Sequence, residues 1–204
     1  MPLGVLGIII GYLLGSIPTA YIVSRLRKGI DIRNIGSRNM GGANVMREIG
    51  AREGVLVGLI DVAKGAVAIL IAQALGIPEL WVFGAGFASL VGHNFPVFAR
   101  FRGGRGAATI IGIFFVLAPE AMLSTLVIVA IPFFTTRKFG AALLVGFALL
   151  PLFIWLLESS LALVGYALVV DTFMLIRNLS SIKQIMSKGI MKDMIYDRYR
   201  KKTK

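Results

Sequence analysis

The chain has 204 residues, of which 57% are hydrophobic, and it contains no cysteine. This composition is too apolar for a soluble domain, and the absence of thiols excludes a disulfide framework, a cysteine nucleophile and a thiolate metal site. The formal net charge of +12 is compatible with nucleic acid, anionic lipid or anionic small molecules as partners, and its uneven distribution along the chain favours the last two.

Apolar segments follow one another along the chain, and an α-helix needs about 20 residues to cross a bilayer. Seven spans are predicted, at about residues 3–24, 54–76, 80–99, 106–118, 120–136, 139–157 and 160–177. The fourth is short and touches the fifth, so this pair also permits a re-entrant hairpin or a single helix. No Lys or Arg precedes the first segment and no small-residue cleavage site follows it, so we interpret it as a retained span.

Basic residues alternate between the connections. Clusters of Lys and Arg occupy residues 25–52, 100–105, 137–138 and 177–204, whereas the connections near 77–79, 119–120 and 158–160 contain neither. The positive-inside rule then places the amino terminus outside and the carboxyl terminus in the cytoplasm, and merging two spans would break the alternation. We therefore predict an all-α integral membrane protein of the cell membrane. It would be a single domain, 1–204, with cytoplasmic loops at about 25–53 and 100–106.

The tail, at about 178–204, is predicted to be a basic amphipathic helix. Its apolar residues recur at helical spacing among lysines and arginines. Such a helix lies on an anionic lipid surface, and we prefer this interpretation to a catalytic one.

Two cytoplasmic loops combine glycine with arginine, which suits the binding of phosphate or carboxylate. Glycines leave backbone N–H groups uncovered, and arginine binds such anions through two parallel N–H groups. The first loop contributes Gly36, Ser37, Arg38, Asn39, Gly41, Gly42, Asn44 and Arg47, and the second contributes Arg102, Gly103, Gly104, Arg105 and Gly106.

Few other ionisable residues lie near or within the predicted spans. His93 is the only histidine, and function and packing are equally good accounts of it; a metal site is not expected. Asp61 and Lys64 share a helix face, and we favour a structural ion pair over a functional role. Asp171 is expected to face the bundle and to pair with Lys64 or an arginine.

With both loops considered, the chain resembles the bacterial acyl-phosphate:glycerol-3-phosphate acyltransferases of the PlsY type over nearly its whole length. The resemblance rests on residues 15–21, 29–33, 36–47, 92–98 and 101–109, and on Asp61 with Lys64. It implies a seven-span helical bundle with a cytoplasmic active site and no cofactor. It also implies transfer of a fatty acyl group from acyl phosphate to the 1-hydroxyl of glycerol 3-phosphate, giving lysophosphatidate and inorganic phosphate, with membrane lipid as the surroundings and no nucleic acid.

The loops and the resemblance together predict the site. The predicted catalytic residues are Ser37, Arg47, His93, Asn178 and Ser181. The predicted phosphate-binding residues are Asn39, Asn44, Arg102, Gly103, Gly104, Arg105, Gly106 and Thr109. The base that deprotonates the attacking hydroxyl is either His93 or a substrate phosphate oxygen, and direct transfer is preferred to acylation of Ser37.

The chain departs from the family pattern at several positions. In the third motif, Asn178 and Ser181 stand where a histidine and an asparagine are usual, and no glutamate follows Gly189. In the first motif Arg38 replaces a glycine and Ala43 a threonine, and Gly140 stands where a serine is frequent. These departures keep three alternatives open: an acyltransferase with another phosphorylated acceptor, a non-catalytic paralogue, and an anion transporter.

Overall fold

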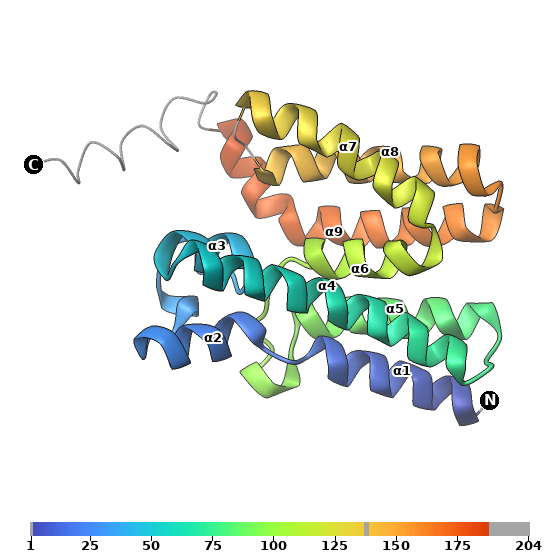
Figure 1. Ribbon diagram of the computed structural model, residues 1–204, viewed down its shortest axis with the longest axis horizontal. Helices are drawn as coiled ribbons and strands as arrows, with labels where there is room; N and C mark the ends of the chain where they lie inside the picture. The colour runs from blue at the N-terminus through green and yellow to red at the C-terminus, as the bar shows by residue number, and fades with distance from the viewer. Residues whose placement is uncertain (1, 137–138, 188–204) are drawn as a thin grey trace, which may run out of the picture.

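The computed structural model describes residues 2–136 and 139–187, with side chains placed for 2–130 and 142–179. Within these residues all regular secondary structure is helical, as predicted (Figure 1). The helices are α1 (Pro2–Gly15), α2 (Thr19–Lys28), η1 (Ile32–Asn34), α3 (Gly42–Glu48), α4 (Ala51–Ala74), α5 (Glu79–Asn94), η2 (Val97–Ala99), α6 (Ala107–Leu117), α7 (Pro119–Thr136), α8 (Phe139–Glu158) and α9 (Leu161–Ser187).

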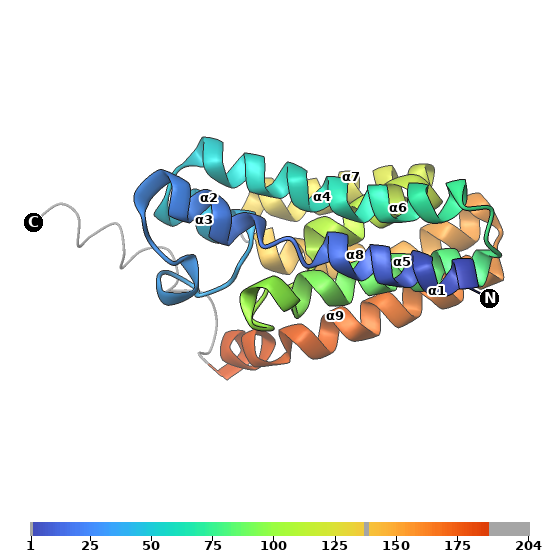
Figure 2. The same cartoon turned by 90° about the horizontal axis from the view of Figure 1, so that it is seen from below.

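The long helices run side by side and form two groups. α1, α4 and α5 pack against one another, α8 packs against α7 and α9, and α6 lies between the groups against α4 and α7 (Figures 1 and 2). α1 approaches α5 closely because glycines of α1 face α5. A Cβ at Gly11 would collide with the backbone of Ala85, and one at Gly15 would collide with the backbone of Ser89. Small residues at such contacts are the usual device for close helix packing in membranes.

Four helical stretches of the described chain are long and apolar enough to cross a membrane: Pro2–Lys28, Ala51–Ala74, Glu79–Ala99 and Leu161–Leu179. Three shorter apolar helices, at Ala107–Leu117, Pro119–Ala130 and Ala142–Glu158, occupy the positions of the other predicted spans. The protein is thus an all-helical, multi-pass membrane protein. The count of seven and the orientation of the termini stay predictions.

The first apolar segment, predicted as one span at residues 3–24, is divided into two helices. α1 ends at Gly15 and α2 begins at Thr19. Pro18 lacks an N–H group and disfavours helical backbone at Ile17, which accounts for the break. The interruption is anchored from α4, because Nζ of Lys64 donates a hydrogen bond of 3.3 Å to the carbonyl of Ile17.

The last helix extends beyond the predicted span. α9 continues to Ser187, so residues 178–187 are not the start of a separate helix. No glycine or proline occurs in 178–187 to end it. The remainder of the predicted amphipathic tail, 188–204, lies outside the described residues.

Two hydrophobic cores hold the fold. The larger one lies among α4 to α9 and contains the fully buried rings of Phe114 and Phe147. The smaller one lies beneath the first glycine and arginine loop and consists of Ala20, Ile32, Met40, Val45, Val57 and Ala99. It joins α2, α3, α4 and η2, and so fixes the two predicted anion-binding loops relative to one another.

Candidate functional site

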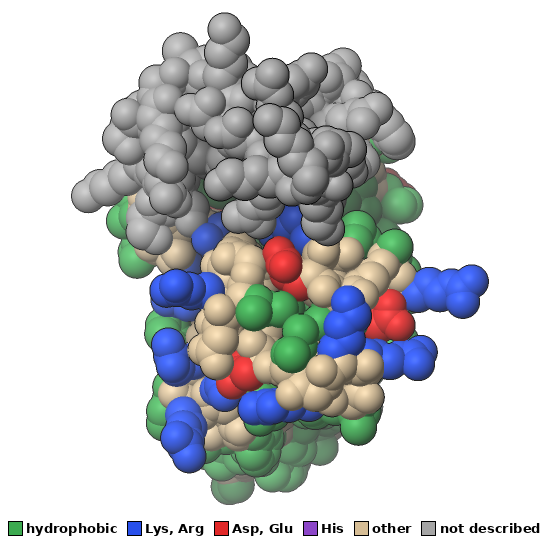
Figure 3. All heavy atoms as spheres, turned by 90° about the vertical axis from the view of Figure 1, so that its left-hand side faces the viewer, with side chains coloured by type: hydrophobic (Ala, Val, Ile, Leu, Met, Phe, Trp, Pro, Cys, Tyr) green, Lys and Arg blue, Asp and Glu red, His purple; other side chains and the backbone are tan. Residues whose placement is uncertain are grey.

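The polar end of the bundle is formed by α2, α3 and the loop at 95–106, opposite the amino terminus (Figure 1). Figure 3 shows Lys and Arg side chains gathered around this end, with fewer carboxylates among them. The predicted site residues therefore lie where the net positive charge of the chain is concentrated.

Asn44 organises the first loop. Its side chain is buried, and its Oδ1 accepts a hydrogen bond of 2.9 Å from the backbone N–H of Ser37. Its Nδ2 donates to the carbonyls of Ile32 and Ile35, at 3.4 and 3.2 Å. These bonds occupy the amide, so a substrate phosphate would have to break one of them to reach it. The geometry gives Asn44 the task of shaping the loop, whereas Ser37 and Arg47 are exposed and Asn39 is half-buried.

Two glycines let the second loop lie directly on the end of α5. The backbone N–H of Gly104 donates a hydrogen bond of 3.0 Å to the carbonyl of His93. A Cβ at Gly104 would collide with Nε2 of His93, and one at Gly103 would collide with its carbonyl. Gly106 adopts φ +88°, which favours glycine. The glycines are required here for close approach, whatever their contribution to anion binding.

His93 lies beneath this loop in a buried ionic cluster. Its Nδ1 is 3.7 Å from Oδ1 of Asp61, and that oxygen is 2.8 Å from Nζ of Lys64. The predicted Asp61–Lys64 ion pair is confirmed. His93 is only 6% exposed and its Nε2 faces Gly104, so the arrangement suits support of the loop.

The predicted pairing of Asp171 is wrong. Both carboxylate oxygens are buried without a hydrogen-bond partner, and no ion pair of Asp171 occurs among the residues with placed side chains. Lys64 is instead committed to Asp61.

Arg177 is a central residue that the sequence did not single out. It directly precedes Asn178 of the third motif, and the sequence shows it only as the first charge of the basic cluster at 177–204. Its Nε donates a hydrogen bond of 3.1 Å to Oδ1 of Asn94, and its Nη2 donates one of 3.4 Å to the carbonyl of Gly104. Its guanidinium also lies 4.5 Å from the centre of the Phe95 ring. One side chain thus joins α9, the end of α5 and the second loop.

Arg105 is the centre of an arginine cluster drawn from three elements. Burial, followed by the charges of Arg177 and Arg47, lowers the pKa of Arg105 from its ordinary value. The ion pairs found within the described part of the chain involve other basic residues and leave Arg105 and Arg177 unneutralised. Arginines without a carboxylate partner form a site for an anion.

The third-motif residues lie on α9, and their predicted role in the site stays a prediction. Asn178 is buried, and its Nδ2 donates a hydrogen bond of 2.8 Å to the carbonyl of Met174 in its own helix. Ser181 lies in α9, and its side chain is outside the described part of the structure. Thr109 is buried where α6 crosses α4, and a Cβ at Gly65 would collide with its carbonyl.

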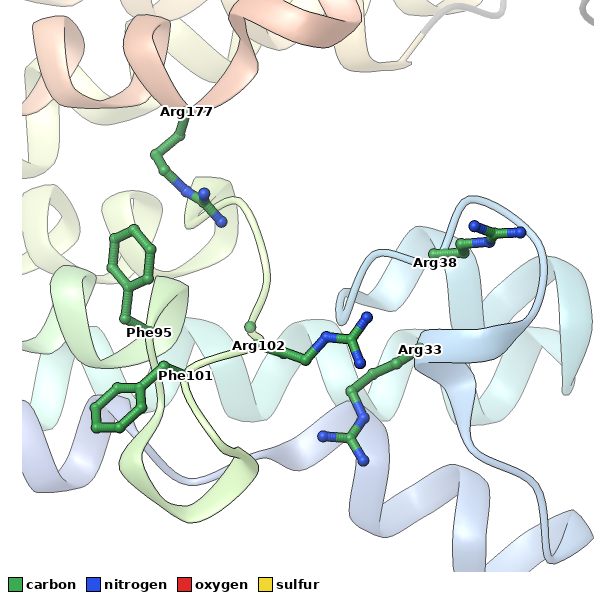
Figure 4. Close-up of a pocket in the computed structure, with 7 residues that line it drawn as sticks. Arg33, Arg38, Phe95, Phe101, Arg102 and Arg177 are labelled. Carbon is green, nitrogen blue, oxygen red and sulfur yellow. The ribbon is translucent and has the colours of Figure 1, made fainter.

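A cavity of about 270 Å³ opens beside the second loop (Figure 4). It is lined by Arg33, Arg38, Phe95, Phe101, Arg102, Gly103 and Arg177. Arg102, predicted to bind substrate phosphate together with Arg105, therefore lies in this neighbouring cavity. Neither Arg105 nor Arg47 lines it.

Known proteins are similar to this chain in sequence. The family model described as glycerol-3-phosphate acyltransferase matches residues 5–188. The glycerol-3-phosphate acyltransferase of Geotalea daltonii is 35% identical over 181 residues, which cover 88% of this chain and 93% of the relative. Glycerol-3-phosphate acyltransferase 5 of Dehalococcoides mccartyi is 47% identical over 143 residues, or 70% of this chain; the match spans 61% of that longer relative.

Solved structures extend the likeness to the fold. The crystal structure of PlsY (YgiH), an integral membrane glycerol 3-phosphate acyltransferase, in its glycerol 3-phosphate form matches with a TM-score of 0.85 at 32% identity. The match covers 93% of this chain and 94% of that one. Its lysophosphatidic acid form matches with a TM-score of 0.84. The chain belongs to the glycerol-3-phosphate acyltransferase family.

Proposed function

We propose that this membrane glycerol-3-phosphate acyltransferase takes its acyl group from an acyl phosphate, and that the arginine cluster around Arg105 collects its two anionic substrates. The observation that carries the proposal is the position of Arg105 beside a glycine loop, near Arg47 and Arg177 and without a carboxylate partner among the described side chains. An acyl phosphate is already activated, so the enzyme mainly has to bind and orient the two phosphate-bearing molecules.

We assign one of the two substrate phosphates to each of the two loops. One phosphate is assigned to Arg105 and the backbone N–H groups of its loop, other than that of Gly104, which is hydrogen-bonded to the carbonyl of His93. The other is assigned to Arg47 with the exposed hydroxyl of Ser37 and the amide of Asn39. Each assignment combines a guanidinium with neutral hydrogen-bond donors, as phosphate recognition requires.

The transfer balances without a cofactor. The 1-hydroxyl oxygen of glycerol 3-phosphate attacks the acyl carbonyl carbon, the bond from that carbon to the phosphate oxygen breaks, and phosphate leaves with the bonding electrons. The hydroxyl proton passes to a phosphate oxygen, whose second pKa of about 6 makes it a usable base. We prefer this base to His93, because the imidazole is buried against Asp61 and faces the backbone of Gly104. Asn178 and Ser181 carry no group able to act as a base.

Direct transfer is proposed over an acyl-enzyme. The hydroxyl of Ser37 is exposed, and its backbone N–H is hydrogen-bonded to Asn44. His93, the only histidine in the sequence, lies beneath the second loop beside Asp61. Rapid-quench mass spectrometry with acyl phosphate alone is expected to show unmodified protein. Acylated Ser37 would overturn direct transfer.

The membrane topology belongs to the same proposal. We propose seven spans in the cell membrane, the amino terminus outside and the loops of the site in the cytoplasm; the charge alternation and the three shorter apolar helices support this. The natural chain has no cysteine, so single variants report on sidedness directly. An impermeant maleimide applied to intact cells should leave Arg52→Cys unlabelled and label Glu79→Cys. The opposite result would invert the topology.

The acyltransferase activity itself is tested by phosphate release. Purified protein is given palmitoyl phosphate with and without glycerol 3-phosphate, and the lipid product is identified by mass. We expect acceptor-dependent release with formation of lysophosphatidate. Arg105→Ala should lower kcat/KM at least tenfold, since it removes a charge-assisted contact to phosphate, whereas the exposed Arg52→Ala should match the natural chain. A folded but silent protein would point to another acceptor or to a non-catalytic paralogue.

A further inference from the structure

A small polar cavity lies where the break between α1 and α2 meets α4 and α5. Its volume is about 10 Å³, and its polar lining comes from Thr19, from Asp61 and Lys64 of α4, and from His93 of α5. A polar cavity of about this size holds a single water molecule when two to four polar groups bind it. We propose that a buried water molecule joins His93 to Asp61 here, and that this hydration site positions the two substrate-binding loops relative to one another.

Nδ1 of His93 is the polar atom for which this water is the partner. His93 is buried, and its Nδ1 has no hydrogen-bond partner within the described part of the chain. Oδ1 of Asp61 lies 3.7 Å away, beyond the usual range of about 2.7–3.2 Å for an N–H···O bond. A buried polar atom is costly to leave unpaired, and a water between the two groups would bond to both.

Two further residues of the lining complete the set of water partners. Nζ of Lys64 has three N–H donors, of which one serves Oδ1 of Asp61 at 2.8 Å and one the carbonyl of Ile17 at 3.3 Å. The third donor is left for the water, and Thr19, which lines the same cavity, carries a hydroxyl oxygen able to accept from it. The water can therefore accept from His93 and Lys64. It can donate to Asp61 and Thr19.

The charges of the lining favour a neutral occupant. The carboxylate of Asp61 and the ammonium of Lys64 neutralise one another at 2.8 Å. An ion added beside this pair, or a protonated His93, would be a buried charge without a partner, which is strongly unfavourable. The occupant is therefore water and not a metal ion or an anion, and the imidazole of His93 is neutral.

The surroundings of His93 also determine its tautomer. A neutral imidazole has one N–H group, and donation to the water places it on Nδ1. Nε2 then presents a lone pair to Gly104. A Cβ at Gly104 would collide with Nε2, so the glycine hydrogen that points in the same direction is directed at this nitrogen. A lone pair accommodates that hydrogen, whereas an Nε2–H group would repel it.

The hydration site touches the chain on the way to both loops of the proposed active site. His93 and Pro96 precede the second loop, and Met40 belongs to the first. Lys64 binds the carbonyl of Ile17, at the break from which α2 leads to the first loop. A change in the site would therefore alter the distance between the loops. Its effect on catalysis, unlike the water and the tautomer, rests on the proposed function, because misplacing one bound substrate relative to the other slows transfer.

The tautomer is tested first, and this test needs no turnover. The chain contains a single histidine, so protein labelled with heavy-nitrogen histidine and purified through a tag without histidine gives imidazole NMR signals from His93 alone. At neutral pH we expect a protonated Nδ1 and an unprotonated Nε2. An Nε2–H tautomer or an imidazolium ion would overturn the proposal.

A crystal structure of the purified natural chain tests the water itself. Density for a water is expected within about 2.7–3.2 Å of Nδ1 of His93, with Asp61 and Lys64 as further partners. A direct hydrogen bond between Nδ1 and the Asp61 carboxylate, with no density between them, would show that the cavity holds no bridging water.

Thr19 provides the test of positioning. Thr19→Val keeps the shape of the side chain but removes the hydroxyl, so the water loses one partner. In a folded protein, kcat should fall about fivefold while the KM for glycerol 3-phosphate changes by less than about twofold. Thr19→Ser keeps the hydroxyl and should recover most of the lost kcat.

Thr125→Val is the matched control. Thr125 is also buried, but its hydroxyl donates to the carbonyl of Ala121 within α7, and it does not line the cavity. Its kcat should stay within about twofold of the natural value, and equal losses of kcat in Thr19→Val and Thr125→Val would show that the site does not position the loops. If the natural chain itself transfers no acyl group, the proposed function fails, whereas the NMR and crystallographic results still decide whether the water is bound and which tautomer His93 adopts.

Discussion

Arg177 on α9 donates a hydrogen bond of 3.1 Å from its Nε to Oδ1 of Asn94, the last residue of α5. A second hydrogen bond, from its Nη2 to the carbonyl of Gly104, extends the link to the glycine loop. The guanidinium therefore fixes the loop that supplies Arg105 relative to the last helix. It also remains near Arg105, whose pKa is lowered first by burial and then by the charges of Arg177 and Arg47, so Arg177 has both a positioning and an electrostatic effect.

Replacing Arg177 by lysine should separate these two effects. Lysine keeps the charge but lacks the planar arrangement of donors that reaches Asn94 and Gly104 together. Loss of such bonds costs about 1.5–3 kcal/mol, so kcat/KM is expected to fall by about tenfold to a hundredfold while the fold is retained. Steady-state kinetics with palmitoyl phosphate and glycerol 3-phosphate measure the change.

A double-mutant cycle provides the control for this prediction. Asn94→Ala should lower kcat/KM by itself and should cause little additional loss in the Arg177→Lys background, because the two residues share one contact. Fully additive effects would show that the Arg177–Asn94 contact does not support activity.

The buried Asp61–Lys64 pair should be intolerant of change at one partner. Asp61→Asn leaves the charge of Lys64 uncompensated beneath the loop, and breaking a buried pair costs about 3–5 kcal/mol. Asp61→Leu combined with Lys64→Met should cost less than Asp61→Asn alone, because no charge is left behind. Thermal unfolding in detergent measures both variants.

The exposed Arg27–Glu53 pair is the matched comparison. Its atoms are 3.2 Å apart, but the Arg27 side chain is 67% exposed. Glu53→Gln is therefore expected to change the stability by at most about 1 kcal/mol. Equal losses at the two pairs would contradict the importance assigned here to burial.

Gly104→Ala should damage the second loop. The added Cβ would collide with Nε2 of His93 and approach the carbonyl of Met40, so the loop must shift away from α5. Overpacking of this kind costs about 1–3 kcal/mol, and we expect a fall in kcat/KM of at least fivefold. Gly58→Ala is the control, because nothing lies within 4 Å of the added atom and helical alanine is favoured over glycine. A Gly104→Ala enzyme with unchanged kinetics would show that the close approach of loop and helix is dispensable.

Asp31 should make stability depend on acid pH. The side-chain hydrogen bond from Arg33 holds the pKa of the Asp31 carboxyl below its ordinary value of 3.8. A lowered pKa means that the contribution of this pair is fully present at pH values well above 3.8 and is lost as the pH falls through the lowered pKa. Unfolding temperatures of the natural chain and of Asp31→Asn, measured from neutral to acid pH, should differ by a constant amount until the pH falls below this range and then converge. If the difference in unfolding temperature disappears already near pH 6, the pH dependence arises from a group other than Asp31.

Local patterns in the sequence determined much of this protein. Long apolar segments require helices in a membrane, because backbone groups there must be hydrogen-bonded within the segment. The spacing of Asp61 and Lys64 along one helix predicted their ion pair, and the motif blocks predicted the family. These conclusions depend on neighbouring residues or on short spacings, which a linear sequence displays directly.

The tertiary structure decided which of these residues meet. Arg177 and Asn94 are 83 positions apart, and only the packing of the helices brings them together. Asn44 was predicted to bind phosphate, but the fold surrounds its amide with loop backbone groups that take its hydrogen bonds. The path of the glycine loop over α5 also determines that Arg102 lines the cavity and that Arg105 does not. Contacts between distant segments depend on close packing and on which polar groups become buried, and no short stretch of sequence contains that information.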